Sequence, residues 1–168
     1  MENNSQAQEI NVVVEKLRKS PTASALLDQA SRNGTKFLTF KEMDSFGPPV
    51  EAAFVGRKNI IELDCSSDQS IPENLGISSA NMAREIITAN LSHHEKLKPL
   101  VGSASNLDTN SHILLHHHAH ATAVAGAVKI GWELKEAGDP NMWDAMRKSE
   151  RYQSSADAFE ACLLYTSP

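Results

Sequence analysis

Apolar side chains recur at steps of three and four along residues 111–137, the longest regular hydrophobic pattern in the chain. This spacing predicts one long α-helix with a single buried face. Possible N-caps between Asp108 and Ser111 and a stop at Gly138 mark the two ends of the predicted helix. The positions that share the predicted buried face are His116, His120, Ala123, Ala127, Ile130 and Leu134. Two histidines therefore begin a face that we expect to pack against a core.

The same spacing predicts shorter helices on both sides of the long one. They cover residues 6–19, 20–33, 79–93, a short segment that starts at 139–140, and residues 154–161. Ser20 and Pro21 offer a cap and a first helical residue for the second of these helices. Residues 66–78 are polar and include a proline and a glycine, so they are predicted to form a connecting loop.

Three segments have the character of β-strands. Residues 36–40 combine phenylalanine with aliphatic and β-branched side chains, and residues 50–55 and 59–64 flank a short turn that starts at Gly56. The turn length predicts a β-hairpin in which the glycine takes the positive φ. The strand and the hairpin are predicted to form a small antiparallel sheet that packs against a helical bundle, which makes the fold class α+β.

The length of 168 residues predicts a single domain, which we place at residues 1–161. Residues 162–168 resemble translated read-through of a sequencing adapter, so we expect them to be non-native. The two cysteines, Cys65 and Cys162, are far apart and lack CxxC spacing. They therefore predict neither a disulfide framework nor a thiolate zinc site.

The charge balance narrows the classes of partner. The chain has 16 basic and 21 acidic residues and a net charge of −5, without the basic stripe that nucleic-acid binding requires. Its first ten residues are polar and acidic, unlike a signal peptide, and no apolar run approaches the length of a membrane span. We expect a protein that binds neither nucleic acid nor membrane, located in the cytoplasm or delivered by a non-classical route.

The histidines are the candidate chemistry of the long helix. Five of the seven fall between His112 and His120, and His112, His116 and His120 follow one another at steps of four. Neutral imidazoles one helical turn apart can bind the same zinc ion. The alternative is that histidines near the start of a helix lie in solvent or bond to a neighbouring carbonyl.

Several segments together resemble a family of small bacterial metallopeptidases of zincin-like type. They are residues 20–27 (SPTASALL), 59–64 (NIIELD), 81–94, and 130–140 (IGWELKEAGDP) with 143–145. The resemblance implies a zincin-like α+β fold in which the helix after the hairpin carries His-Glu-x-x-His. It also implies that the histidines bind zinc with an acidic third ligand from the later long helix. The glutamate between them would take a proton from zinc-bound water.

The sequence departs from the motif that this resemblance implies. Aligning the helix keeps the glutamate as Glu85 but puts Arg84 and Thr88 where the histidines belong. Arginine stays protonated and does not bind a metal cation. A shifted match restores the first histidine at His94 but puts Lys98 at the second position. Neither alignment completes the motif.

Two functions from different classes are compatible with this pattern. The first is a zinc-dependent hydrolase of proteins or peptides with a rearranged metal site, in which His116 and His120 are joined by His93 or His94. In that hypothesis Glu85 is the catalytic residue, and the acidic third ligand of the family falls at or near His120. The alternative is a catalytically inactive relative that has lost zinc and binds a protein or peptide partner. Metal content separates the two hypotheses.

Overall fold

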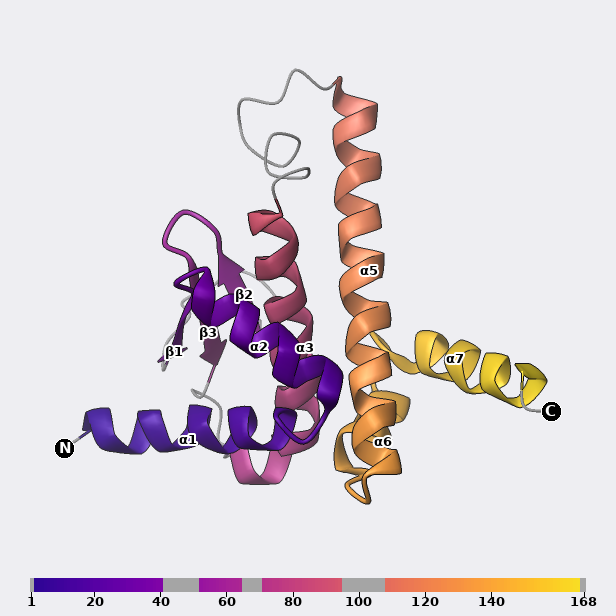
Figure 1. Cartoon of the computed structure of the whole chain (residues 1–168), viewed down its shortest axis with the longest axis horizontal. Helices are drawn as coiled ribbons and strands as arrows, with labels where there is room; N and C mark the ends of the chain where they lie inside the picture. Colours follow the sequence, from indigo (N-terminus) through magenta and orange to yellow (C-terminus); the bar gives the residue numbers. More distant parts are fainter. Residues whose placement is uncertain (1, 41–51, 65–70, 95–107, 167–168) are drawn as a thin grey trace.

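A computed structural model describes residues 2–40, 52–64, 71–94 and 108–166, which form six helices and three strands (Figure 1). In chain order these are α1 (Glu2–Leu17), α2 (Pro21–Arg32), β1 (Lys36–Phe40), β2 (Ala52–Val55), β3 (Ile60–Asp64), α3 (Ile71–His93), α5 (Thr109–Glu136), α6 (Asn141–Lys148) and α7 (Gln153–Thr166). The α+β class predicted from the sequence is confirmed. None of the described helices is long and apolar enough to cross a membrane.

The sheet is mixed, so the prediction of an antiparallel sheet is wrong for its first strand. The strand order is β1-β3-β2, with β2 antiparallel to β3 and β1 parallel to β3. The first strand, β1, thus pairs with the second strand of the hairpin and runs in the same direction. Ile61 and Leu63 on the central strand β3 are fully buried and alternate with half-buried residues, as expected for a strand with one face on the core.

The hairpin turn differs from the prediction in the residue that takes the positive φ. That residue is Asn59, with φ of 53°, and not Gly56. Asparagine tolerates the left-handed region because its short amide can bond locally. Here the Asn59 side chain donates to the carbonyl of Asn33 at 2.9 Å and accepts from the Thr35 hydroxyl at 3.0 Å. The turn is therefore fixed to the segment between α2 and β1.

The central helix is α3, which packs against α5, α6, α1, α2 and the sheet. It begins at Ile71, so residues 71–78 do not form the predicted connecting loop, whose first five residues lie outside the described part of the chain. The helix is interrupted only at Asn74, with φ of −110° and ψ of 16°. The proline in this segment falls at the helix start, where it is tolerated. The glycine, Gly76, serves a close contact and not a turn: a Cβ there would lie 2.5 Å from the carbonyl oxygen of Asn141.

Replacing Gly76 by alanine is expected to lower the free energy of unfolding by about 1 to 3 kcal/mol. The new methyl group would meet backbone and Cβ atoms of α6, which cannot move away as a flexible side chain can. Urea denaturation measures the change. The control is Gly56→Ala, whose Cβ would have an ordinary contact of 3.6 Å with the Phe54 ring. Equal stability of the two variants would contradict close packing of α3 on α6.

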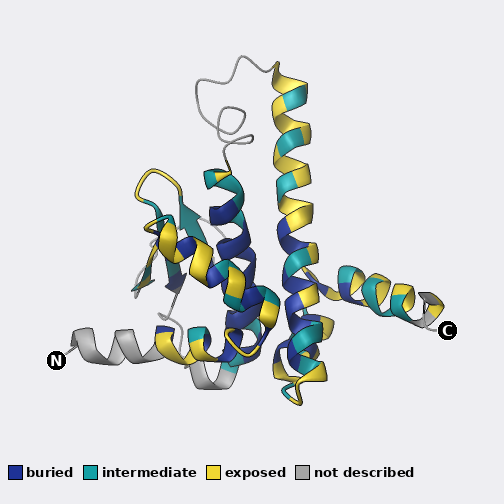
Figure 2. Cartoon of the chain, in the orientation of Figure 1, coloured by how far each residue is buried: buried dark blue, intermediate teal, exposed yellow. Residues whose placement is uncertain are grey.

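The long helix α5 confirms the sequence prediction at both ends. The Asp108 carboxylate accepts the backbone N–H groups of Asn110 and Ser111 at 3.0 and 3.1 Å, and Gly138 follows the helix with φ of 89°. Its buried face, however, begins at Ala123 (Figure 2). His116 and His120 are exposed, so their predicted place on a buried face is wrong.

Three aromatic rings pack together at the corner after α5. Trp132 and Trp143 pack edge to face with ring centroids 5.0 Å apart, and Phe159 of α7 lies against both rings. Leu134 is fully buried in the same core. The amine of Lys135 lies 4.2 Å from the centroid of the Trp132 ring. Helix α7 continues to Thr166, into the segment that the sequence analysis set apart.

Candidate functional site

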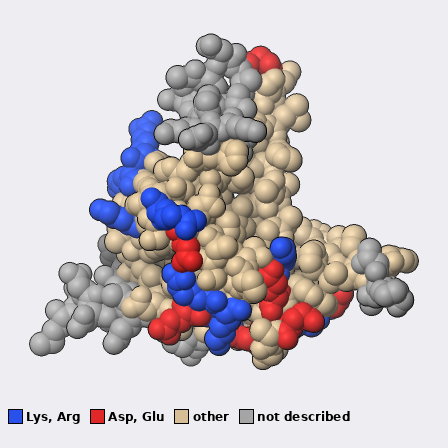
Figure 3. Space-filling model, in the orientation of Figure 1, with Lys and Arg blue, Asp and Glu red and all other residues tan. Residues whose placement is uncertain are grey.

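An open cavity of about 620 Å³ lies between β2, α3 and the exposed half of α5. Apolar side chains and histidines form most of its wall. The lining residues are Phe54, Gly56, Arg84, Glu85, Thr88, Leu91, Ser92, His112, Leu115, His116, His118, Ala119, His120 and Thr122. Residues 109–128 contain no Lys, Arg, Asp or Glu, and Figure 3 shows an uncharged surface over the upper part of α5. Among the described residues that line the cavity, Arg84 and Glu85 are the only Lys, Arg, Asp or Glu side chains.

Arg84 and Glu85 form a buried ion pair in this cavity. Each residue is 8% exposed, and the Nε and Nη2 groups of Arg84 lie 2.7 and 2.6 Å from the same oxygen of Glu85. The pair stands alone in an uncharged stretch of α3, since residues 74–93 contain no other Asp, Glu, Lys or Arg. Burial of either charge alone would carry a large desolvation penalty, and the attraction between the two charges offsets part of it.

The same pair closes the outer edge of the sheet. The second oxygen of Glu85 accepts the backbone N–H of Phe54 at 2.9 Å, and Nη2 of Arg84 lies 3.4 Å from the carbonyl oxygen of Ala52. These two backbone groups flank Ala53, which is paired with β3. They are the groups through which a further strand would bond to β2. A peptide therefore cannot add to the sheet at this position while the pair is in place.

Four histidines of α5 form the opposite wall. His116 and His120, one turn apart, both line the cavity, as do His112 and His118. Partial burial lowers the pKa of His120 below its ordinary value, and the positive charge of Arg84 lowers it further. Both effects favour the neutral form of the His120 imidazole.

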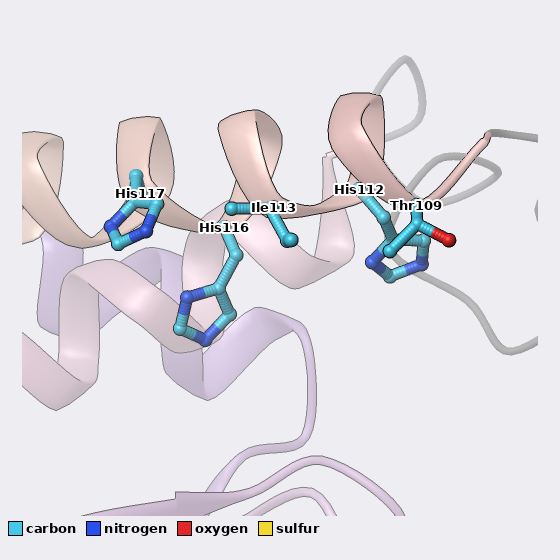
Figure 4. Close-up of a pocket in the computed structure, with 5 residues that line it drawn as sticks. All are labelled: Thr109, His112, Ile113, His116 and His117. Atoms are coloured by element: carbon cyan, nitrogen blue, oxygen red, sulfur yellow. The ribbon is translucent and has the colours of Figure 1, made fainter.

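A second hollow of about 470 Å³ lies along α5, with His112 and His116 shared between the two. In Figure 4 the His116 side chain points from α5 toward the neighbouring ribbons, while His117 stays beside α5. The rings of His116 and His117 are 6.3 Å apart and nearly perpendicular. His112 and His116 therefore line both hollows.

The other two predicted ligands lie elsewhere. His93 is half-buried at the end of α3, and its Nε2 lies 2.9 Å from the side-chain oxygen of Asn59 in the hairpin turn. His94 is exposed at the next position. Neither lines the cavity. The alternative alignment that starts at His94 continues into residues outside the described part of the chain.

The described side chains of the cavity do not fit a zinc peptidase centre. Within residues 2–40, 52–64, 71–94 and 108–166, no three His, Cys, Asp or Glu side chains are grouped so that they could hold a metal ion. The guanidinium of Arg84 lies beside the only carboxylate of the cavity and would repel a cation there. Both oxygens of Glu85 already accept hydrogen bonds, from Arg84 and from the Phe54 N–H, which hold this carboxylate at the edge of the sheet.

Comparison with known families decides the relationship. The sequence matches the family described as "Putative metallopeptidase family (DUF6782)" over residues 1–166. The chain belongs to this family. The match confirms the metallopeptidase resemblance inferred from the sequence, but it does not show a zincin-like motif. No curated protein and no solved structure matches the chain.

Sequence reasoning identified the histidines, Arg84, Glu85 and Thr88 but missed the apolar side chains of the cavity. These are Leu115 and Ala119 of α5, Leu91 of α3 and Phe54 of β2. A signal was present: Leu115 and Ala119 precede Ala123 at steps of four, so they extend the buried stripe toward the start of α5. The sequence analysis considered Arg84 only as a residue that cannot bind a metal. Two adjacent opposite charges in an otherwise uncharged helix also indicate that the two side chains have specific interactions.

A polar network holds α5 against the start of α2 and so fixes one wall of the cavity. One oxygen of Glu133 accepts the Ser20 hydroxyl at 2.5 Å and the Thr22 N–H at 3.1 Å, and the other accepts the Thr22 hydroxyl at 2.6 Å. Ser20 also caps α2, because its hydroxyl oxygen accepts the N–H of Ala23 at 3.0 Å. Burial raises the pKa of Glu133, but these hydrogen bonds outweigh it, and the pKa lies below its ordinary value.

This network predicts a pH-dependent part of the stability. A carboxylate whose pKa is lower in the folded chain stabilises it above the unfolded-state pKa, about 4.3 for glutamate. That stabilisation is lost as the pH falls through the lower folded-state value. Glu133→Gln is therefore expected to cost about 1 to 3 kcal/mol at pH 7 and less at pH 3. Urea denaturation at both pH values measures this, with exposed Glu136→Gln on the same helix as the control. A loss that does not depend on pH would contradict the ionised network.

Proposed function

We propose that the protein is a peptide-binding member of its metallopeptidase family that does not carry out the standard zinc-dependent hydrolysis. The single observation that supports this most directly is the Arg84–Glu85 pair. The resemblance implies a zinc ligand at the position of Arg84 and a proton acceptor at Glu85. In this chain the residue at the ligand position is a permanently charged arginine. The carboxylate of Glu85 accepts hydrogen bonds from Arg84 and from the Phe54 N–H.

The cavity supports binding of a peptide in preference to catalysis. It is open, largely apolar and lined from two helices and a strand edge, as ligand-binding clefts commonly are. Its volume of about 620 Å³ is large enough for one or two side chains of a peptide. Because the edge of β2 is closed, the peptide would lie between α3 and α5 and not as a fourth strand.

A matched pair of substitutions tests the binding site. Leu115 lines the cavity, while its neighbour Leu114 is 69% exposed and does not. We expect peptides selected from a random displayed library on the full chain to bind Leu115→Trp about tenfold more weakly than the wild type. Leu114→Trp should bind them as the wild type does. Failure to select any peptide, or an equal effect of both substitutions, would contradict the proposed site.

A second function, zinc binding by a rearranged site, is favoured by one observation. His116 and His120 line the same cavity one turn apart, and the lowered pKa of His120 favours the neutral imidazole that binds metals. Metal analysis and zinc titration of the wild type, His116→Ala and His120→Ala separate the two functions. We expect no stoichiometric zinc in the wild type. Stoichiometric zinc that is lost in both variants would contradict the binding-module proposal and support the rearranged site.

A further inference from the structure

The buried guanidinium of Arg84 has donors that its described neighbours do not use. Its side chain is 10% exposed and lines the cavity. Nε and Nη2 share one oxygen of Glu85, and the only other described contact of Nη2 is the long one to the Ala52 carbonyl. Within the described part of the chain, Nη1 makes no hydrogen bond. A guanidinium offers five N–H donors, so its Nη1 end is left for an acceptor that comes from the cavity.

The remaining polar groups of the cavity also favour an acceptor. The carboxylate of Glu85 is engaged on both oxygens. The hydroxyls of Thr88 and Thr122 donate to carbonyls of their own helices, at 3.0 and 2.8 Å. The other ionisable side chains are the four imidazoles of the α5 wall, each of which can donate an N–H whether neutral or protonated. Free donors therefore face the cavity from both α3 and α5.

We infer that the cavity is a carboxylate-binding subsite in which the free Nη1 end of Arg84, beside the histidines of α5, takes an acidic group of a bound peptide. This inference rests on the proposed peptide binding and adds the chemical class of the bound group. Nη1 of a guanidinium can donate a charge-assisted hydrogen bond to a carboxylate oxygen. Phe54, Leu91, Leu115 and Ala119 would cover the methylene groups that carry the acid. The acid is a glutamate or aspartate side chain or a C-terminal carboxylate, which have the same chemistry.

Three versions of one short capped peptide distinguish these sources. The first is Ac-Leu-Ala-Glu-Ala-Leu-amide, the second replaces glutamate by glutamine, and the third has glutamine with a free C-terminal carboxylate. Nuclear magnetic resonance titration of the full chain gives each affinity. We expect at least one acidic peptide to bind about tenfold more tightly than the neutral one, with the largest shifts at the amides of Arg84 and Leu115. The acidic peptide that is preferred identifies the source.

Arg84→Lys keeps a cation beside Glu85 but removes the planar fork. We expect the ratio of the affinities for the acidic and the neutral peptide to fall to about twofold or less in this variant. If the variant does not fold, the wild-type comparison still decides, because acidic and neutral peptides that bind within about twofold of one another overturn the inference. Absence of binding by all three peptides overturns the proposed function as well. Equal binding of all three overturns only the carboxylate subsite.

Discussion

Replacing Arg84 by methionine is expected to lower the free energy of unfolding by about 3 to 5 kcal/mol, because it leaves the Glu85 charge buried without its partner. Methionine fills most of the space of the arginine stem, so the loss reports the charge and the hydrogen bonds more than the volume. Chemical denaturation at pH 7 measures the change. The matched control is Arg18→Met, which breaks an ion pair with Asp28 whose two side chains are about half exposed. That change should cost less than about 1 kcal/mol.

A double variant separates the charge from the strand contact. Arg84→Met with Glu85→Leu removes both charges, so most of the loss should be recovered. The Phe54 N–H then lacks its acceptor, which leaves a deficit of about 1 to 3 kcal/mol. Amide hydrogen exchange at Phe54 should become faster in this variant. If Arg84→Met costs no more than Arg18→Met, or if exchange at Phe54 does not change, the pair does not hold the edge of the sheet.

Replacing Trp143 by alanine is expected to cost about 3 to 5 kcal/mol. Trp143 is 1% exposed and contacts the rings of Trp132 and Phe159, so its loss leaves a cavity at the place where α5, α6 and α7 meet. Thermal and urea denaturation measure the loss, and near-ultraviolet circular dichroism reports the remaining Trp132 ring. The control is Tyr165→Ala, at a side chain that is 91% exposed, with an expected change within about 0.5 kcal/mol. Similar losses at the two positions would contradict the packed corner.

Local signals in the sequence were sufficient for both ends of α5 and for the start of α2, although not for the start of α3. Asp108 and Gly138 bound α5, and Ser20 with Pro21 begins α2, because capping depends on residues within one turn of each other. The strand order could not be predicted in the same way, because the pairing of β1 with β3 joins segments that are distant along the chain. Gly76 was misread for a related reason. Its role depends on Asn141, which no local pattern connects to it.

The candidate site was predictable by residue type and less so by arrangement. The spacing of His116 and His120 placed both imidazoles on one side of α5, and both line the cavity. Their exposure could not be read from the spacing, because it depends on how far α3 and the sheet extend along α5. The partner of Glu85 was also hidden, since an adjacent arginine usually points to solvent. Here both side chains instead contact backbone groups on the outer edge of β2.

The anchoring of the first helices to the end of α5 has a consequence for the order of folding. Glu133 bonds to Ser20 and Thr22, and Asp139 pairs with Lys16, across separations of 111 to 123 residues. On the ribosome, α1 and α2 are complete long before these carboxylates are synthesised. Contacts of this range slow folding, because a large loop must close before they form. The contacts of α1 and α2 with the end of α5 therefore form after these helices can pack on α3. A nascent chain that stalls before Glu133 would lack these contacts and would be the form exposed to chaperones and proteases.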